Sequence, residues 1–583
     1  MKFWYNPNFL AIAALLVLSI PALKSLAIPG FYTSHDGETH TARIAQYYKA
    51  ITDGQFPPRF AGSFYNGLGS PIFVYIYPLP YILGSAIHAT GLSFTDSFKI
   101  LMASGFIFSG VFSYLWLREV FGSEKAAFLG ALFYMWVPYR FLLIYVRGSL
   151  SEMLAYTFLP LVFYSATRLA QEKNVRWVAA TSLSFSLLLA SQNLVAMITA
   201  PIIAIYIFIL AVFAKSSKFL AYGIIAGFWG AAIAAFVYLP SLFERGFVRF
   251  NQIISQSYVN HFVTLKQLIR SPWGYGFDLP GTVSDQMSFQ VGLAHLFIFV
   301  VATILIVYLT LRKFMFPKKV PLNFIENASP NILILSLFFL VISLVLIFLM
   351  LNTQLTVYTW QHVRLLNFVD LPWRFLGPAT LALSFLAAFV TKVTKLGLFF
   401  LFLVAFVLVA NRNHLRINLA LQRDDDFFQN YIGTATQYDE FTPIWRQTTR
   451  VPIGFDPNVN VELITGQANI SNVLAKSNIV SFDTQAFSKE AQVRVNKFYF
   501  PEWKVKVDGK RLTPFKDLTV SGPASLRLDK EQDSSGLMVI NLTNGTHKIV
   551  AKFTETPLRL FANYLTLGSL ILALGIIIKN AKV

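Results

Sequence analysis

The sequence predicts a polytopic α-helical membrane protein that carries a β-rich domain near its C-terminus. Of its 583 residues, 55% are hydrophobic and only 13% are charged, whereas a soluble domain contains about 25% charged residues. Apolar runs of roughly 20 residues, the length that crosses the hydrocarbon core of a bilayer, recur along the chain. A long polar stretch with alternating apolar residues follows residue 411 and predicts the β-rich domain.

Charge and cysteine content exclude several classes of partner and site. The chain has no cysteine, so disulfides and thiolate metal sites are excluded. The formal net charge is +19, but much of this charge lies in short connectors between apolar runs. This distribution is typical of positive-inside topology, so we expect the lipid bilayer, and no nucleic acid, as a partner.

Twelve apolar runs are candidate membrane spans. They cover residues 9–28, 98–117, 126–145, 152–168, 176–191, 194–214, 219–239, 289–311, 331–351, 373–391, 396–411 and 558–578. The first run resembles a signal peptide, but it is long and no cleavage site of small residues follows it. We therefore expect a retained signal-anchor.

A further apolar stretch, residues 70–91, decides the topology. If it does not span and the N-terminus is cytoplasmic, five short connectors and the C-terminal tail fall in the cytoplasm and carry fifteen Lys and Arg residues. The positive-inside rule therefore favours about 12 spans, with 13 spans as the alternative. Pro71, Pro78 and Pro80 favour an interfacial or re-entrant helix inside a long first outer loop.

The chain then divides into three parts, with the cytoplasmic membrane as the expected location. The predicted parts are a transmembrane domain at 1–411 with outer loops at 29–97 and 240–288, an extracytoplasmic β-rich domain at 412–557, and a final transmembrane helix with a cytoplasmic tail at 558–583. Within the β-rich domain, Asp508-Gly509 in "KVKVDGKRL" predicts a two-residue hairpin turn, and "HKIVAKF" at 547–553 alternates as a strand does.

The motif "HDGETH" at 35–40 lies just beyond the first span. Two carboxylates as close as Asp36 and Glu38 favour a raised pKa on one of them, which suits a general base. The same oxygens suit a divalent cation, with His35 or His40 nearby. The alternative is that Asp36 is the N-cap of an amphipathic helix that starts at Gly37. A functional role and a capping role of Asp36 are compatible, and the sequence leaves both open. It also leaves open whether a metal ion is required.

A second polar motif, "VRGSLSEM" at 146–153, contains Arg147 and Glu152 at the outer end of a predicted span. The planar fork of an arginine binds phosphate oxygens in pairs, so Arg147 is a candidate phosphate ligand. The alternative is that Arg147 pairs with Glu152 or extends to lipid headgroups. Ionisable groups at span ends that face a cavity mark functional sites.

A third motif, "HVRLLNFVDLPWRF" at 362–375, contains Arg364 and Arg374 on either side of Asp370. These two arginines are further candidate phosphate ligands, and Arg59 is another. His362 is a candidate acceptor or metal contact. Trp373 is interpreted as an aromatic-belt residue at the membrane interface.

Taken together, these motifs resemble a known family. The acidic motif after the first span, the second acidic motif before the fourth span and the outer C-terminal domain resemble the GT-C superfamily of membrane glycosyltransferases. More narrowly, "TSHDGETHTARIAQYYKAITDGQFPPRF", "YVRGSLSEM" and "DLPWRFLG" resemble the bacterial membrane proteins that carry the "6-pyruvoyl-tetrahydropterin synthase-related" membrane domain. "FYFPEWKVKVDGK" is similar to the outer-domain motif of YfhO-type membrane proteins.

The resemblance implies an inverting glycosyltransferase that takes a sugar from a polyprenyl-phosphate carrier and passes it to an extracytoplasmic glycan, lipid or protein acceptor. It implies that Asp36 is the catalytic or acceptor-orienting group and that Glu152 is the second acidic position. The second motif reads "RGSLSE" instead of a paired Asp-x-Asp, so the implied divalent cation stays open. The alternatives are a non-catalytic GT-C-like scaffold or glycan-binding protein and, less favoured, a lipid or glycan transporter, for which inverted repeats are expected.

Overall fold

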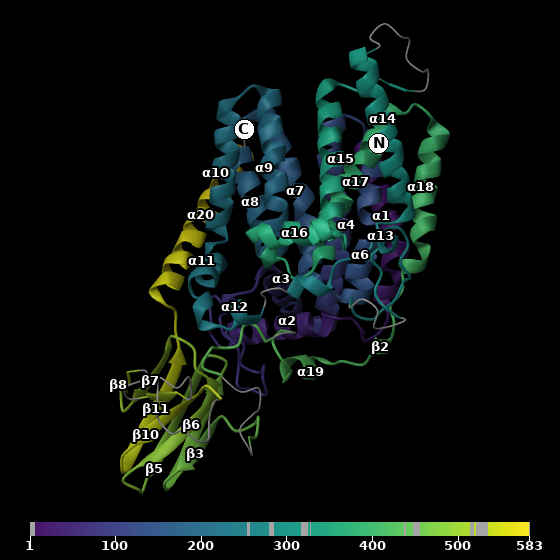
Figure 1. Ribbon diagram of the computed structural model, residues 1–583. Coiled ribbons are helices and arrows are strands. Elements are labelled where there is room, and N and C mark those ends of the chain that lie inside the picture. Colours follow the sequence, from purple (N-terminus) through teal and green to yellow (C-terminus); the bar gives the residue numbers. More distant parts are fainter. Residues whose placement is uncertain are drawn as a thin grey trace.

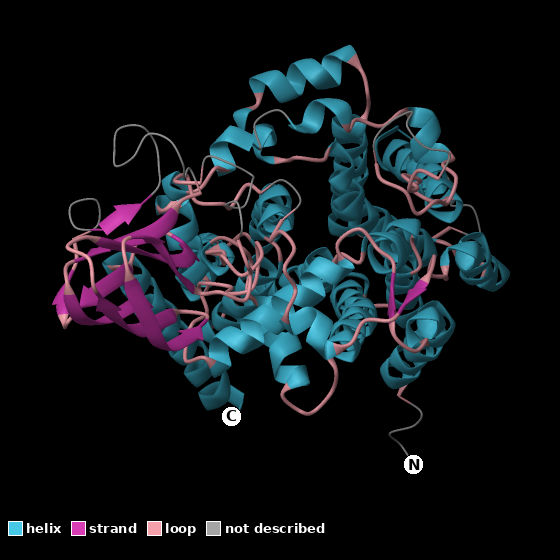
Figure 2. Ribbon diagram, turned by 90° about the horizontal axis from the view of Figure 1, so that it is seen from below, coloured by secondary structure: helices cyan, strands magenta, loops and turns pink. Residues whose placement is uncertain are grey.

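The computed structural model describes residues 6–253, 257–278, 285–315, 325–326, 328–436, 439–446, 455–513, 518–520 and 535–581. Figure 1 shows a bundle of helices with strands β3 to β11 at one end and both chain termini toward the other. These strands form a β sandwich, so we call this end of the bundle the sandwich end. Figure 2, a view along the bundle, shows the strands beside the helices instead of below their centre.

Eight helices of the described residues are long and apolar enough to cross a membrane, which identifies a membrane protein by composition. They are α1 (Pro7–Leu23), α4 (Phe94–Phe121), α9 (Asn193–Ala214), α14 (Leu293–Met315), α15 (Pro330–Met350), α17 (Leu376–Val393), α18 (Gly397–Asn411) and α20 (Pro557–Ala581). Two bent combinations raise the number to ten if each counts as one span. These are α5 (Glu124–Met135) with α6 (Pro138–Phe141) and η3 (Leu142–Arg147), bent by 46°, and α10 (Ser217–Ile233) with α11 (Ala235–Phe243), bent by 77°.

The expected number of about 12 spans is therefore higher than the structure supports. The two remaining predicted spans correspond to α7 (Leu150–Glu172) and α8 (Val175–Ser191). The first contains Glu152 and several other polar residues, and the second has only 17 residues. Most of α7 is buried, and it packs against α4 and α8. A helix that contacts other helices instead of lipid does not need a uniformly apolar surface, so hydropathy alone does not settle its role.

The first loop supports a non-spanning interpretation of residues 70–91. This segment forms η2 (Ile72–Val74) and α3 (Leu79–His88). A helix of ten residues is about 15 Å long, half the thickness of the hydrocarbon core. The loop also forms β1 (Phe31–Tyr32) and α2 (Gly37–Thr52), and Figure 1 shows α2 lying across the sandwich end.

Short elements complete the sandwich end. They are η1 (Lys24–Ala27), η4 (Arg245–Phe247), α12 (Phe250–Ile253), η5 (Ser257–Asn260), α13 (Leu265–Ile269), α16 (Gln354–His362), η6 (Arg364–Phe368), η7 (Pro372–Phe375), η8 (Arg412–His414), β2 (Ala420–Leu421) and α19 (Asp425–Gln429). The predicted outer loop 240–288 includes η4 to α13, and its residues 254–256 and 279–284 lie outside the described ranges.

The strands of the predicted β-rich domain form two antiparallel sheets. Their bounds are β3 (Val461–Thr465), β4 (Ala468–Lys476), β5 (Ile479–Ala486), β6 (Ala491–Phe498), β7 (Trp503–Val507), β8 (Lys510–Arg511), β9 (Leu518–Val520), β10 (Leu537–Leu542) and β11 (Gly545–Phe553). One sheet has the order β3-β6-β10-β9 and the other β4-β5-β11-β7-β8. Inward-facing residues of both sheets, among them Val493 and Val505, share one apolar core, so the fold is a β sandwich.

The predicted hairpin is present. Asp508 and Gly509 connect β7 to β8 with φ angles of 51° and 81°, the left-handed values that a type I′ turn requires at both central residues. The sandwich is narrower than the predicted 412–557 region, because its first strand begins at Val461. The chain before it contacts both parts: β2 pairs with β1 and α19 packs against α2, whereas Trp445 is part of the sandwich core.

The sandwich is tied to the helices through the first loop. Lys497 of β6 donates to the carbonyl of Gly62 over 3.1 Å, and the main chain of Ser477 donates to Asp53 over 2.8 Å. Two aromatic residues of the first loop, Phe60 and Tyr75, are part of the sandwich core. The first loop therefore positions the sandwich against the bundle.

Candidate functional site

Asp36 lies beside Arg147 because two main-chain segments run together. The amide of His35 donates to the Val146 carbonyl over 3.0 Å, and the amide of Asp36 donates to the Arg147 carbonyl over 2.7 Å. Gly148 permits this approach, since it has a φ of +61° and a Cβ there would lie 2.9 Å from the Gly37 nitrogen. The two sequence motifs thus meet through backbone geometry.

The side chain of Arg147 joins two carboxylates. Its Nη1 donates to Glu152 Oε1 over 2.6 Å, and its Nη2 lies 3.4 Å from Asp36 Oδ2. The indole of Trp373 packs on the guanidinium, with its ring centre 4.8 Å from Cζ. Arg147 ends the π-helical turn η3, and such turns are frequent at functional sites because they redirect side chains.

Glu152 connects Arg147 to a second arginine. The hydroxyl of Tyr139 donates to Glu152 Oε2 over 2.8 Å, and Arg374 Nε lies 3.7 Å from Oε1. Arg374 in turn pairs with Asp370 over 3.2 Å. Glu152 also lies in the first turn of α7, where the helix dipole favours an anion.

The result is a network of three carboxylates and two guanidiniums, which we call the Arg147 network: Asp36, Arg147, Glu152, Arg374 and Asp370. Its members differ in accessibility. The side chains of Glu152 and Arg147 are 1% and 5% exposed, and that of Asp36 is 37% exposed. A ligand can reach Asp36, whereas the buried pair behind it holds Asp36 in place.

Asp36 occupies the N-cap position of α2, but its side chain makes no capping hydrogen bond. Its carboxylate is directed to Arg147 instead. The structure therefore does not show the capping contact that one of the two interpretations of Asp36 predicts. A carboxylate held by a guanidinium is available to accept a hydrogen bond or a proton from a ligand.

Glu38 does not share a partner with Asp36. It pairs with Arg423 over 2.7 Å, on the side of α2 that faces the chain before the sandwich. His35 Nε2 lies 2.9 Å from the Tyr275 carbonyl, and His40 is buried with Nδ1 3.2 Å from the Tyr81 hydroxyl. Burial, and then the charges of Arg43 and Arg147, lower the pKa of His40 well below its ordinary value, so it is neutral at pH 7.

A divalent cation therefore has no evident set of ligands here. Among the described residues, no group of three or more His, Asp or Glu side chains is arranged to hold a metal ion. The third candidate histidine, His362, is exposed and stacks on Tyr358 at a ring distance of 3.9 Å. Within the described ranges, none of the three histidines forms a hydrogen bond to Asp36 or Glu152.

Two of the candidate arginines lie outside the Arg147 network. Arg59 is 2% exposed, and it pairs with Glu555 over 3.0 Å and donates to Asn563 over 2.8 Å. It therefore connects the first loop to the chain between β11 and α20. Arg364 is exposed on η6.

The sequence did not predict a second series of contacts, which leads from Arg147 through Trp373 and Asp278 to His261. The interpretation of Trp373 as a belt residue is wrong: it is 2% exposed, and its indole nitrogen donates to Asp278 Oδ2 over 2.8 Å. His261 Nδ1 lies 2.6 Å from the same oxygen. Burial raises the pKa of Asp278, but the hydrogen bonds from His261 and Trp373 outweigh it and hold the pKa below its ordinary value. Seventeen positions separate His261 from Asp278, and no local pattern links them.

No protein-family model matches this chain, and a comparison with curated proteins finds no match.

Proposed function

We propose that this protein is a membrane glycosyltransferase that moves a sugar from a polyprenyl-phosphate donor to an extracytoplasmic acceptor. The observation that carries the proposal is the contact between Asp36 and Arg147: an accessible carboxylate held by a buried guanidinium at one end of a membrane bundle. The resemblance of the same motifs to GT-C enzymes supports it. Twelve of the fifteen basic residues in the predicted cytoplasmic segments lie outside the connection between α7 and α8, and they support the placement of this end outside the cytoplasm.

In this proposal Asp36 accepts the proton of an acceptor hydroxyl. The acceptor oxygen then forms a bond to the anomeric carbon of the donor sugar, with inversion, while the bond from that carbon to the carrier phosphate breaks. The bonding electron pair leaves with the phosphate, whose negative charge needs a fixed positive partner. Proton, sugar and leaving group are thereby accounted for without a metal ion, and the proposal makes no use of one.

The contacts of Arg147 refine its role. Because the side chain of Arg147 is only 5% exposed, we assign Arg147 to the positioning of Asp36 and not to the phosphate. The phosphate contact is assigned to Arg374, whose side chain is 14% exposed, and to the exposed Arg364. Glu152 is assigned to the support of Arg147, since its side chain is 1% exposed.

One observation favours a second function, that of a non-catalytic membrane scaffold. Arg147 and Arg374 are both paired with carboxylates, and a buried, internally paired ion network is also found where it serves only to specify the fold. In a scaffold, Asp36 would have no reactive role.

Turnover by the intact protein separates these functions. The purified chain is reconstituted in liposomes with polyprenyl-phosphate donors that carry radiolabelled hexoses, and acceptor glycans, lipids and proteins are added on the outside. Transfer of label from the lipid fraction to an acceptor supports the transferase. A cooperative thermal denaturation first shows that the protein is folded. Absence of transfer by this folded protein across the panel of donors and acceptors supports the scaffold instead.

A further inference from the structure

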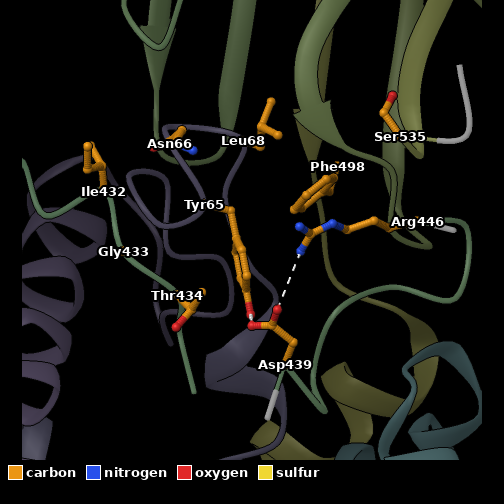
Figure 3. A pocket seen from close by; sticks show the side chains of 10 residues that line it. All are labelled: Tyr65, Asn66, Leu68, Ile432, Gly433, Thr434, Asp439, Arg446, Phe498 and Ser535. Carbon is orange, nitrogen blue, oxygen red and sulfur yellow. Dashed lines mark hydrogen bonds and ion pairs between the residues drawn. The ribbon is translucent and has the colours of Figure 1, made fainter. Parts of the chain in front are cut away.

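A cavity of about 380 Å³ lies where the first loop, the chain before the sandwich and the sandwich itself meet. Its volume is in the range of small-molecule sites. Figure 3 shows the side chains around it, which come from segments far apart in the sequence. They are Tyr65, Asn66, Leu68, Ile432, Gly433, Thr434, Asp439, Arg446, Phe498 and Ser535.

Main-chain hydrogen bonds join these segments, so the cavity is preformed. The amide of Tyr65 donates to the Gly433 carbonyl over 3.0 Å, and the amide of Asn66 donates to the Ile432 carbonyl over 2.9 Å. The amide of Phe498 in β6 donates to the Leu68 carbonyl, also over 2.9 Å. A site whose walls are fixed in advance loses little conformational entropy when a ligand binds.

One wall of the cavity combines aromatic and charged groups. The hydroxyl of Tyr65 donates to Asp439 Oδ1 over 2.9 Å. The guanidinium of Arg446 lies over the rings of Tyr65 and Phe498, 5.0 and 5.3 Å from their centres. Its Nη1 is 4.0 Å from Asp439 Oδ2, and Figure 3 shows Tyr65, Asp439 and Arg446 converging.

The backbone that presents Tyr65 is strained. Tyr65 and Asn66 both have left-handed φ angles, 57° and 58°. This conformation is an outlier for a bulky aromatic residue and persists only where surrounding contacts stabilise it. Here it places the phenol ring against Arg446 and the phenol hydroxyl against Asp439. Backbone strain of this kind clusters at ligand-binding sites.

The composition of the wall identifies the ligand chemistry. Six of the ten lining residues have hydrogen-bonding side chains, whereas the apolar surface comes mainly from Leu68, Ile432 and Phe498. The charges of Asp439 and Arg446 balance each other. Asp439 Oδ1 accepts the Tyr65 hydroxyl, and a carboxylate has about four acceptor positions, so Asp439 can accept ligand hydroxyls as well. An uncharged molecule with many hydroxyls and one apolar face fits these groups.

We infer that this cavity binds a neutral saccharide, with Asp439 accepting sugar hydroxyls and the Tyr65 and Phe498 side providing the apolar contact. The inference does not depend on the proposed transfer reaction, because the cavity shares no residue with the Arg147 network. A scaffold that binds glycan would use the same cavity.

Saturation-transfer difference NMR tests the inference with the full-length chain in lipid nanodiscs, since maltoside detergents would compete. The probes are methyl α-glucoside, methyl β-galactoside and N-acetylglucosamine. We expect at least one of them to receive magnetisation. Asp439→Asn should weaken that binding about tenfold or more, because the loss of a charged hydrogen-bonding partner has effects of this size. Arg446→Met should also weaken it, because the guanidinium packs on Tyr65 and Phe498 and lies beside Asp439. Tyr65→Phe should weaken it less.

Glu490→Gln is the matched control, because Glu490 is an exposed carboxylate of the sandwich away from the cavity. It should bind the probe as the wild type does. Absence of signal from all three probes, or equal binding by wild type, Asp439→Asn and Arg446→Met, would overturn the inference. Because binding is measured without a donor lipid, failure here leaves the transfer assay interpretable, and failure of transfer leaves this result interpretable.

Discussion

Arg147 Nη1 lies 2.6 Å from Glu152 Oε1, and both side chains are almost completely buried. Two opposite charges taken out of water are tolerated because each satisfies the other and because Tyr139 and Trp373 complete their surroundings. The pair fixes the guanidinium at the point where Asp36 meets it. The most accessible carboxylate of the network therefore depends on the least accessible one.

This dependence predicts a large effect on stability when the pair is broken. Arg147→Met leaves Glu152 buried without its main partner, which typically reduces stability by about 3–5 kcal/mol. The control is Arg118→Met, since the Arg118–Glu124 pair has side chains 32% and 36% exposed and such pairs contribute about 0–1 kcal/mol. Thermal unfolding midpoints in one detergent compare the two variants. An equal shift for both would mean that the buried pair is not a structural element.

The fold was largely accessible from the sequence because hydrophobic periodicity is a local signal. The spans, the break near residue 411 and the Asp508-Gly509 turn all follow from neighbouring residues. The structure supports fewer spans than predicted, because α7 carries polar residues and α8 has only 17 residues, so neither meets the length and hydropathy of a span. Residues 412–460 were assigned to the β-rich domain because they are polar, yet β2 and α19 within them pack on the first loop, whereas Trp445 belongs to the sandwich core.

The site was only partly accessible from the sequence. Asp36, Arg147, Glu152 and Arg374 were selected by residue type and predicted depth, and the structure brings them together. Sequence adjacency misled the assignment of Glu38, because side chains two positions apart on a helix point to nearly opposite faces, so Glu38 faces Arg423 instead of Arg147. Arg59 and the contact of Trp373 with Asp278 depend on tertiary packing, for which the sequence holds no local signal.

Arg59 and Arg364 should respond differently to the same substitution. Arg59→Met removes a buried pair with Glu555 and a hydrogen bond to Asn563, so we expect a lower thermal midpoint and faster proteolysis between β11 and α20. Arg364→Met changes an exposed side chain and should leave both unchanged. If Arg59→Met folded as stably as the wild type, the tethering role would be wrong and a ligand-binding role would return.

Lys497 predicts a pH dependence of stability. Its side chain is 5% exposed, and burial lowers its pKa from 10.5 to about 8. Between these values the unfolded chain binds more protons than the folded chain, so the unfolding free energy should rise as the pH increases from about 8 to 10.5. Thermal midpoints of wild type and Lys497→Met are compared across this range. Parallel pH profiles for the two proteins would contradict the pKa shift.

The topology is testable with single cysteines, because the chain has none of its own. Asn174 connects α7 to α8, and Lys489 lies in the sandwich between β5 and β6. If α7 and α8 cross the bilayer, a membrane-impermeant maleimide should label Asn174→Cys and Lys489→Cys from opposite sides of a sealed vesicle. Labelling of both from one side would show that this helix pair does not span.

The substitution Asp36→Asn tests the proposed function most directly. It keeps the shape of the side chain and removes the proton-accepting charge, so sugar transfer should fall by a factor of about 100 or more. The control Asp96→Asn makes the same change at an exposed position in the first turn of α4 and should transfer at the wild-type rate. Both are measured with a polyprenyl-phosphate sugar donor in liposomes, after thermal denaturation has shown that each variant is folded. Loss of transfer in Asp36→Asn alone is the predicted result, and wild-type transfer by Asp36→Asn would contradict the assignment of Asp36 as the base.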